Sequence, residues 1–175
     1  LPGKDISYNK SSFALDNNAT SSDRMMTAMG QGETLVSPYH MALITSAVAN
    51  GGRLMEPYLV EEVTNYSGTI VEETDPESYG QLMTSEEAAQ LKAYMQNVTD
   101  YGTGSVFAGS GYSVAGKTGT AEYSDGDSSK NHSWFVGFTN VDNPELVISV
   151  IIEEADGNVR AVDVAKQILD SYYYN

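Results

Sequence analysis

The segment Ala115-Gly116-Lys117-Thr118-Gly119-Thr120-Ala121-Glu122 lies in the most informative part of this 175-residue chain. Period-two alternation places Thr118 and Thr120 on one face of an extended strand, as two hydroxyls at adjacent positions. Gly119 between them has no side chain to obstruct the close approach of another backbone. The edge of such a strand can accept an extended peptide, whose terminal carboxylate the hydroxyls would bind.

Two further strand-like segments follow this stretch. Turn-forming residues at 124–127 and 142–144 separate three predicted strands, at 114–123, 133–141 and 145–154. Because short turns join antiparallel neighbours, the sequence predicts a three-stranded antiparallel sheet near the end of the chain.

Three helices and a hairpin are predicted around these strands. Ser37 is the predicted N-cap of a helix whose first position is Pro38 and which ends at 50–52, Asn-Gly-Gly. A capping box predicts a second helix from Thr84, and apolar spacing predicts a third over about 159–172. Residues 54–74 are predicted to form strands around a turn at 65–68, and residues 1–36 are predicted to be mostly loop. The fold class that follows is α+β.

Composition excludes several classes of function. The chain has 24 Asp and Glu against 9 Lys and Arg, a net charge of −15, so nucleic acid and anionic membrane surfaces are not expected partners. It has no cysteine, which excludes disulfides and thiolate chemistry. The spacing of His40 and His132 suggests no metal site. His40 is expected in the first turn of a helix and His132 in a turn before a strand, and both are interpreted as structural. No apolar run is long enough for a membrane segment, and the length fits one domain.

Lys117 also belongs to a second pattern. Residues 111–118 (GYSVAGKT) fit the phosphate loop G-x-x-x-x-G-K-[ST], which would make the chain a nucleotide-binding protein. That motif needs a buried strand before it and a helix after it. The residues on each side predict neither, so nucleotide binding through Gly111–Thr118 is kept only as an alternative.

The sequence around this lysine resembles the penicillin-binding protein transpeptidases, most closely the monofunctional (class B) branch. The resemblance rests on residues 115–122, on 133–138 (SWFVGF), and on three upstream segments in the family's order. These are 30–42 (GQGETLVSPYHMA), 47–52 (AVANGG) and 101–104 (YGTG). Together they span about residues 30–170, and they imply part of the penicillin-binding protein and serine β-lactamase-like fold.

The resemblance implies roles for the K-T-G residues. The family's site combines S-x-x-K, S-x-N and K-T-G, and its serine is acylated by a D-Ala-D-Ala peptide or a β-lactam. Lys117 would lie beside the S-x-N serine and help set electrostatics and proton transfer, with Gly119 completing the motif. Thr118 and Thr120 would bind the substrate carboxylate, and the Thr120 N–H would be one oxyanion-hole donor. No cofactor or metal is implied.

The other two elements are not found in usable form. Ser7-Tyr8-Asn9-Lys10 fits S-x-x-K, and its first three residues fit S-x-N, but one tetrapeptide cannot serve both roles. The nucleophile motif also needs a helix, which the residues on each side do not favour. Residues 1–175 are therefore interpreted as the C-terminal part of a transpeptidase domain without its nucleophile, and this chain alone is predicted to be inactive.

The expected partners follow from the same resemblance. They are peptidoglycan stem peptides, β-lactams and the N-terminal remainder of a parent protein. The parent would act at the extracytoplasmic face of a bacterial membrane, anchored by an N-terminal segment absent from this chain. Related alternatives are a D,D-carboxypeptidase, a β-lactamase or a non-catalytic β-lactam sensor. A final alternative is an acidic interaction module without chemistry.

Overall fold

A computed structural model describes residues 8–13, 15–125 and 128–174 of the chain. The helices are α1 (Ser21–Ala28), α2 (Pro38–Ala49), α3 (Ser85–Asp100) and α4 (Ala161–Tyr174), with a 3₁₀ turn at Ser105–Phe107. The strands are β1 (Arg53–Met55), β2 (Glu62–Thr64), β3 (Ile70–Glu73), β4 (Ser78–Gln81), β5 (Val114–Asp125), β6 (Ser128–Thr139) and β7 (Val147–Ile152). This mixture of helices and antiparallel sheet confirms the α+β class.

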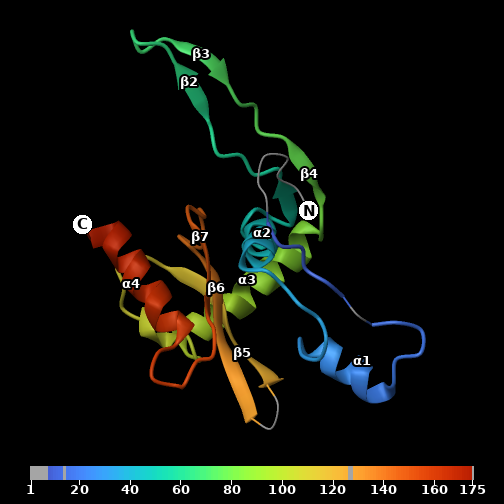
Figure 1. The fold of residues 1–175 in the computed structure, drawn as a ribbon. Helices are drawn as coiled ribbons and strands as arrows, with labels where there is room; N and C mark the ends of the chain where they lie inside the picture. Colours follow the sequence, from blue (N-terminus) through green and yellow to red (C-terminus); the bar gives the residue numbers. More distant parts are fainter. Residues whose placement is uncertain (1–7, 14, 126–127, 175) are drawn as a thin grey trace.

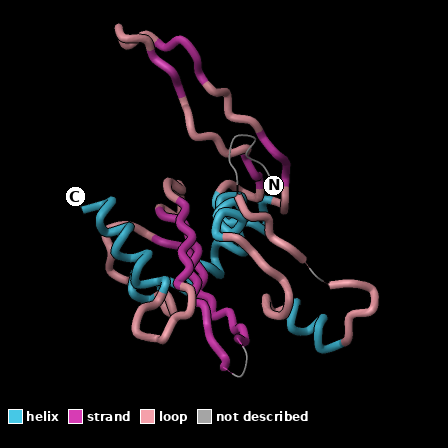
Figure 2. Tube along the Cα trace, viewed as in Figure 1, coloured by secondary structure: helices cyan, strands magenta, loops and turns pink. Residues whose placement is uncertain are grey.

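The three predicted C-terminal strands form one antiparallel sheet in the order β5-β6-β7. In its register, Lys117 lies opposite Val136, Thr118 opposite Phe135 and Thr120 opposite Ser133. Figures 1 and 2 show the sheet at the centre of the molecule, with α4 along one face and α2 on the other side. Because the strand order is β5-β6-β7, β5 is an edge strand of this sheet.

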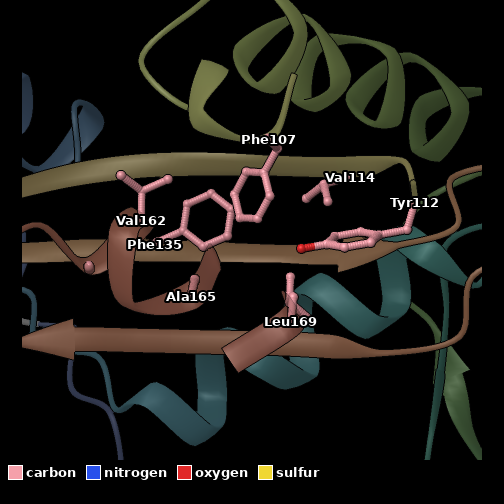
Figure 3. Packing of buried hydrophobic residues seen from close by; sticks show 8 residues of the cluster. Phe107, Tyr112, Val114, Phe135, Val162, Ala165 and Leu169 are labelled. Carbon is pink, nitrogen blue, oxygen red and sulfur yellow. The ribbon is translucent and has the colours of Figure 1, made fainter. Parts of the chain in front are cut away.

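The main core lies between the sheet and α4. Phe135 is completely buried there, and Figure 3 shows its ring beside that of Phe107, with Val162 and Leu169 of α4 packed around them. On the opposite face, Ala115 and Phe138 pack against the end of α2. Alternate residues of β5 thus face two different layers, as expected for a strand covered on both faces.

The predicted starts of α2 and α3 are confirmed, whereas α4 begins and ends two residues later than predicted. Ser37 caps α2 by accepting a hydrogen bond from the His40 N–H, and Pro38 occupies the first helical position. Thr84 and Glu87 form the predicted capping box of α3. After α2, Gly51 and Gly52 both adopt positive φ, the conformation that ends a helix most easily at glycine.

Residues 8–13 and 15–36 are mostly loop, as predicted for the N-terminal stretch, but they also contain the eight-residue helix α1, which was not predicted. Its capping box joins Thr20 to Asp23, and none of its residues is buried. The 54–74 hairpin is confirmed as β2 and β3 around the predicted turn, extending away from the rest of the molecule in Figure 1. The β4 strand, which pairs with β1, was not predicted. None of the helices in the described part of the chain is both long and apolar enough to cross a bilayer.

Candidate functional site

The outer edge of β5 carries the residues predicted to act. Within the described residues, β5 pairs only with β6, so its other edge has no neighbouring strand. Three β5 carbonyls accept hydrogen bonds from side chains at that edge. Val114 accepts from Thr99 Oγ1 (2.5 Å), Thr118 from the Lys117 ammonium, and Thr120 from Gln31 Nε2 (3.0 Å). The free edge is thus a set of backbone groups that β6 does not use.

The same pattern gives the direction of the Thr120 N–H. In an extended strand, the N–H and C=O of one residue point toward the same edge. Because the Thr120 carbonyl is bonded to Gln31 at the free edge, the Thr120 N–H also faces that edge. An added extended segment could therefore reach the Thr120 N–H, while the Thr120 carbonyl already accepts from Gln31.

The side chains divide between the two faces of the sheet. Thr118 and Thr120 line a cavity of about 460 Å³ on the α4 side, together with Thr103 and Arg160. Lys117 lines a second hollow of about 520 Å³, on the α2 side, with Gln31 among its other residues. Gly119 and Thr120 border both, so the two hollows adjoin at this point of β5.

The lysine and the arginine that line these two hollows, Lys117 and Arg160, both have identified partners. The exposed Lys117 side chain donates to the Thr118 carbonyl. Arg160 binds the Asp163 carboxylate through two hydrogen bonds of 2.8 and 2.6 Å, and this bonding raises the pKa of Arg160. The same contact lowers the pKa of the Asp163 carboxyl, so both groups stay charged near neutral pH.

Two residues of this site were not assigned roles from the sequence. Thr103 Oγ1 lies 2.5 Å from Thr118 Oγ1, and Gln31 reaches Thr120 across 89 positions of sequence. Both residues lie in segments that carried the family resemblance, at 101–104 and 30–42. No local periodicity could indicate these contacts, because they depend on how distant segments pack.

Two glycines of the segment 115–122 lie in close contact with strand β6. A Cβ at Gly116 would lie 2.5 Å from Phe135 Cζ and 2.9 Å from the Val136 carbonyl oxygen. A Cβ at Gly119 would meet Trp134 Cβ at 3.2 Å, so the closest neighbour at Gly119 is the adjacent strand. Gly116 is therefore explained by the space that the buried Phe135 ring needs.

The phosphate-loop alternative is wrong for this chain. In that motif the lysine and threonine lie between a strand and a helix, where free backbone amides face the phosphates. Here Lys117 and Thr118 lie inside the twelve-residue strand β5, which continues to Asp125. Residues 111–118 therefore do not form a phosphate-binding loop.

Both histidines make local contacts. His40 lies in the first turn of α2, as predicted, with Nδ1 2.7 Å from Ser11 Oγ, and burial lowers its pKa. The placement of His132 in a turn was wrong, because it lies within β6, stacks on Tyr123 and accepts from the Glu154 N–H. In the described part of the chain, no group of three or more acidic or histidine side chains could hold a metal.

Ser7 of the tetrapeptide Ser7-Tyr8-Asn9-Lys10 lies outside the described residues. Tyr8, Asn9 and Lys10 belong to neither a helix nor a strand.

Comparison with known proteins identifies the family. Residues 1–170 match the penicillin binding protein transpeptidase domain. The chain is 32% identical over 172 residues to peptidoglycan D,D-transpeptidase MrdA of Haemophilus influenzae, covering 87% of this chain and 26% of that protein. It is 32% identical over 142 residues to stage V sporulation protein D of Bacillus subtilis, covering 79% and 22%. The chain therefore spans about a quarter of the length of these curated relatives.

Solved structures give the same result for the fold. The transpeptidase domain of a peptidoglycan glycosyltransferase from Eggerthella lenta is 33% identical with a TM-score of 0.65, covering 82% of this chain and 34% of that one. Penicillin-binding protein A of Mycobacterium tuberculosis, solved as an imipenem acyl-enzyme complex, is 26% identical with a TM-score of 0.70, covering 84% and 33%. The chain belongs to the penicillin binding protein transpeptidase domain family, and its relatives are class B penicillin-binding proteins.

Proposed function

We propose that this chain is the C-terminal part of a peptidoglycan D,D-transpeptidase domain and supplies the K-T-G wall of its active site. The observation that carries the proposal is the free edge of β5, where the backbone groups of Thr118 and Thr120 point away from β6. Family membership and the names of the curated relatives support the same activity.

The proposed reaction uses this edge to hold the acyl donor. A stem peptide ending in D-Ala-D-Ala would lie extended along β5, in the manner of an added strand. The hydroxyls of Thr118 and Thr120 would bind its terminal carboxylate. The Thr120 N–H would stabilise the oxyanion that forms at the scissile carbonyl, a contact typically worth about 10²–10³ in rate.

The nucleophile would come from outside this chain. A serine in the N-terminal remainder of the parent attacks the carbonyl carbon, the peptide bond breaks, and D-alanine leaves with the serine's proton. The amine of a second stem peptide then attacks the acyl carbon and the ester bond to the serine breaks. The cross-link forms as an amide, and the proton lost by the amine returns to the serine oxygen. Lys117 would favour these steps through its positive charge and help transfer protons. The scheme requires no metal or cofactor.

The proposal extends to β-lactams, to the isolated chain and to the location of the parent protein. A β-lactam would react as a mimic of the acyl donor and leave a stable acyl-serine. The chain alone would be inactive, since Ser7 does not act as the nucleophile. The parent would work at the extracytoplasmic face of the bacterial membrane, anchored by a segment outside this chain.

The test is acylation of the longer parent protein by a fluorescent penicillin. Lys117→Ala should slow acylation by about 10²-fold or more, the usual contribution of a group that assists proton transfer. Lys10→Ala is the matched control, because the Lys10 side chain is exposed and the proposal gives no role to the tetrapeptide at 7–10. Normal acylation of the Lys117→Ala protein would contradict the proposal, and so would loss of acylation in the Lys10→Ala protein.

Analysis of the reaction products distinguishes a transpeptidase from a carboxypeptidase and from a β-lactamase. A transpeptidase should transfer the acyl group to an added amino acceptor. Release of acid alone would indicate a carboxypeptidase, and rapid hydrolysis of the penicillin would indicate a β-lactamase. Either of the last two results would replace the transpeptidase assignment.

A further inference from the structure

We infer that Thr103 is a positioning residue, which orients the Thr118 hydroxyl toward the carboxylate of the acyl donor. The inference rests on the proposed function and adds to it a residue outside the K-T-G motif. Its starting point is the 2.5 Å contact between Thr103 Oγ1 and Thr118 Oγ1. Both side chains line the 460 Å³ cavity that also contains Thr120.

The loop that carries Thr103 is held firmly against the end of α3. A Cβ at Gly102 would lie 2.9 Å from the Val98 carbonyl oxygen, and one at Gly104 would lie 3.1 Å from it. The N–H groups of both glycines donate to that same carbonyl. Because a Cβ at Gly102 would clash with this backbone carbonyl and one at Gly104 would lie tightly against it, the backbone on each side of Thr103 packs closely on the end of α3.

A second threonine fixes α3 to the same strand. Thr99 is almost fully buried, and its Oγ1 donates to the Val114 carbonyl at 2.5 Å. Thr99 and Thr103 are four residues apart, and so are their partners Val114 and Thr118. The pair of contacts therefore sets the position of the α3 end along β5, and with it the position of the Thr103 hydroxyl.

The chemistry of two touching hydroxyls determines what the pair can do. Each hydroxyl has one hydrogen to donate and two lone pairs to accept. When Thr103 donates to Thr118 Oγ1, the Thr118 hydrogen stays available for a ligand. The Thr118 and Thr120 side chains line the same cavity on one face of β5, so in this arrangement both hydroxyls can donate to one carboxylate.

This orientation matters because the cation in the cavity is already paired. Arg160 lines the same cavity, but two of its N–H groups bind Asp163. The Lys117 side chain lies on the other face of the strand and donates to the Thr118 carbonyl. Arg160 and Lys117 thus already have partners, and the Thr118 and Thr120 hydroxyls are further donors on this face.

The test compares three variants of the longer parent protein. Thr103→Val removes the hydroxyl with little change in shape, Thr103→Ser retains it, and Thr64→Val is a matched control on the exposed strand β2. Each is reacted with penicillin G and with its methyl ester, which lacks the carboxylate charge. Thermal unfolding of each variant checks that the fold is intact.

We expect Thr103→Val to slow acylation by penicillin G about tenfold, since hydrogen bonds to charged groups are among the stronger ones. Its reaction with the methyl ester should change much less, while Thr103→Ser and Thr64→Val should behave as wild type with both compounds. Equal loss with both compounds, or no loss with either, would overturn the inference. If wild type itself formed no acyl-enzyme, the proposed function would fail, and this inference with it.

Discussion

Gly116 shows how a single residue sets the packing of the edge strand. Gly116→Ala would place a methyl group 2.5 Å from the ring of Phe135, which is completely buried, so the surrounding core would have to shift. We expect a loss of about 1–3 kcal/mol in the free energy of unfolding, the usual cost of overpacking a core. Urea unfolding measures it.

Gly119→Ala is the matched control in the same strand. Its added methyl group would meet Trp134 Cβ at 3.2 Å, and Trp134 is only half-buried. The loss should therefore be smaller than for Gly116→Ala. Equal losses would show that the Phe135 ring does not explain the glycine at position 116.

His40 predicts a pH dependence of stability. Burial lowers its pKa in the folded chain below the usual 6.5, so the folded state favours the neutral imidazole. His40 takes up a proton more readily in the unfolded chain than in the folded chain. The contribution of His40 to the free energy of unfolding is therefore fully present above pH 6.5 and decreases as the pH falls below that value.

Thermal unfolding at pH 7.5 and 5.5 tests this. Wild type should lose more stability on acidification than His40→Gln, which has no titratable group at this position. An identical pH dependence in the two proteins would contradict the assignment. Lys10→Ala, a substitution at an exposed residue, is the control and is melted in the same buffers. It should lose as much stability on acidification as wild type does.

The capping boxes of α3 and α1 should contribute differently to the stability of the whole molecule. Thr84→Ala removes the capping box of α3 and should cost about 1 kcal/mol, because α3 packs against β5. Thr20→Ala removes the same motif from α1, which has no buried residue, so global stability should change little. Urea unfolding of the two variants tests whether the loss in the free energy of unfolding depends on the capping box alone or on how the capped helix packs. Equal losses would contradict this difference.

The same two helices show what local sequence can predict. The starts of α2 and α3 follow from Ser37 and Thr84, because capping is a local interaction between neighbouring residues. The α1 helix was missed because it lacks a buried apolar face, and its only strong local signal is the pair Thr20 and Asp23. The β4 strand was missed because Ser78–Gln81 contains no alternating apolar residues.

The arrangement of the whole molecule required the structure. Residue alternation predicted that Thr118 and Thr120 share a face, and the cavity on the α4 side agrees with that prediction. The contacts of Thr103 and Gln31 were not predicted, because they form only when α3 and the segment before α2 reach the free edge of β5. Local patterns therefore gave the strand and the motif, while tertiary packing gave the residues around them.

We propose that this chain forms one wall of a transpeptidase site and carries no nucleophile. Intact-mass spectrometry of the 175-residue chain after incubation with penicillin tests both parts of this proposal, with the longer parent as the positive control. We expect an unchanged mass for the chain and a covalent adduct on the parent. An adduct on this chain that maps to Ser7 would show that the chain carries its own nucleophile.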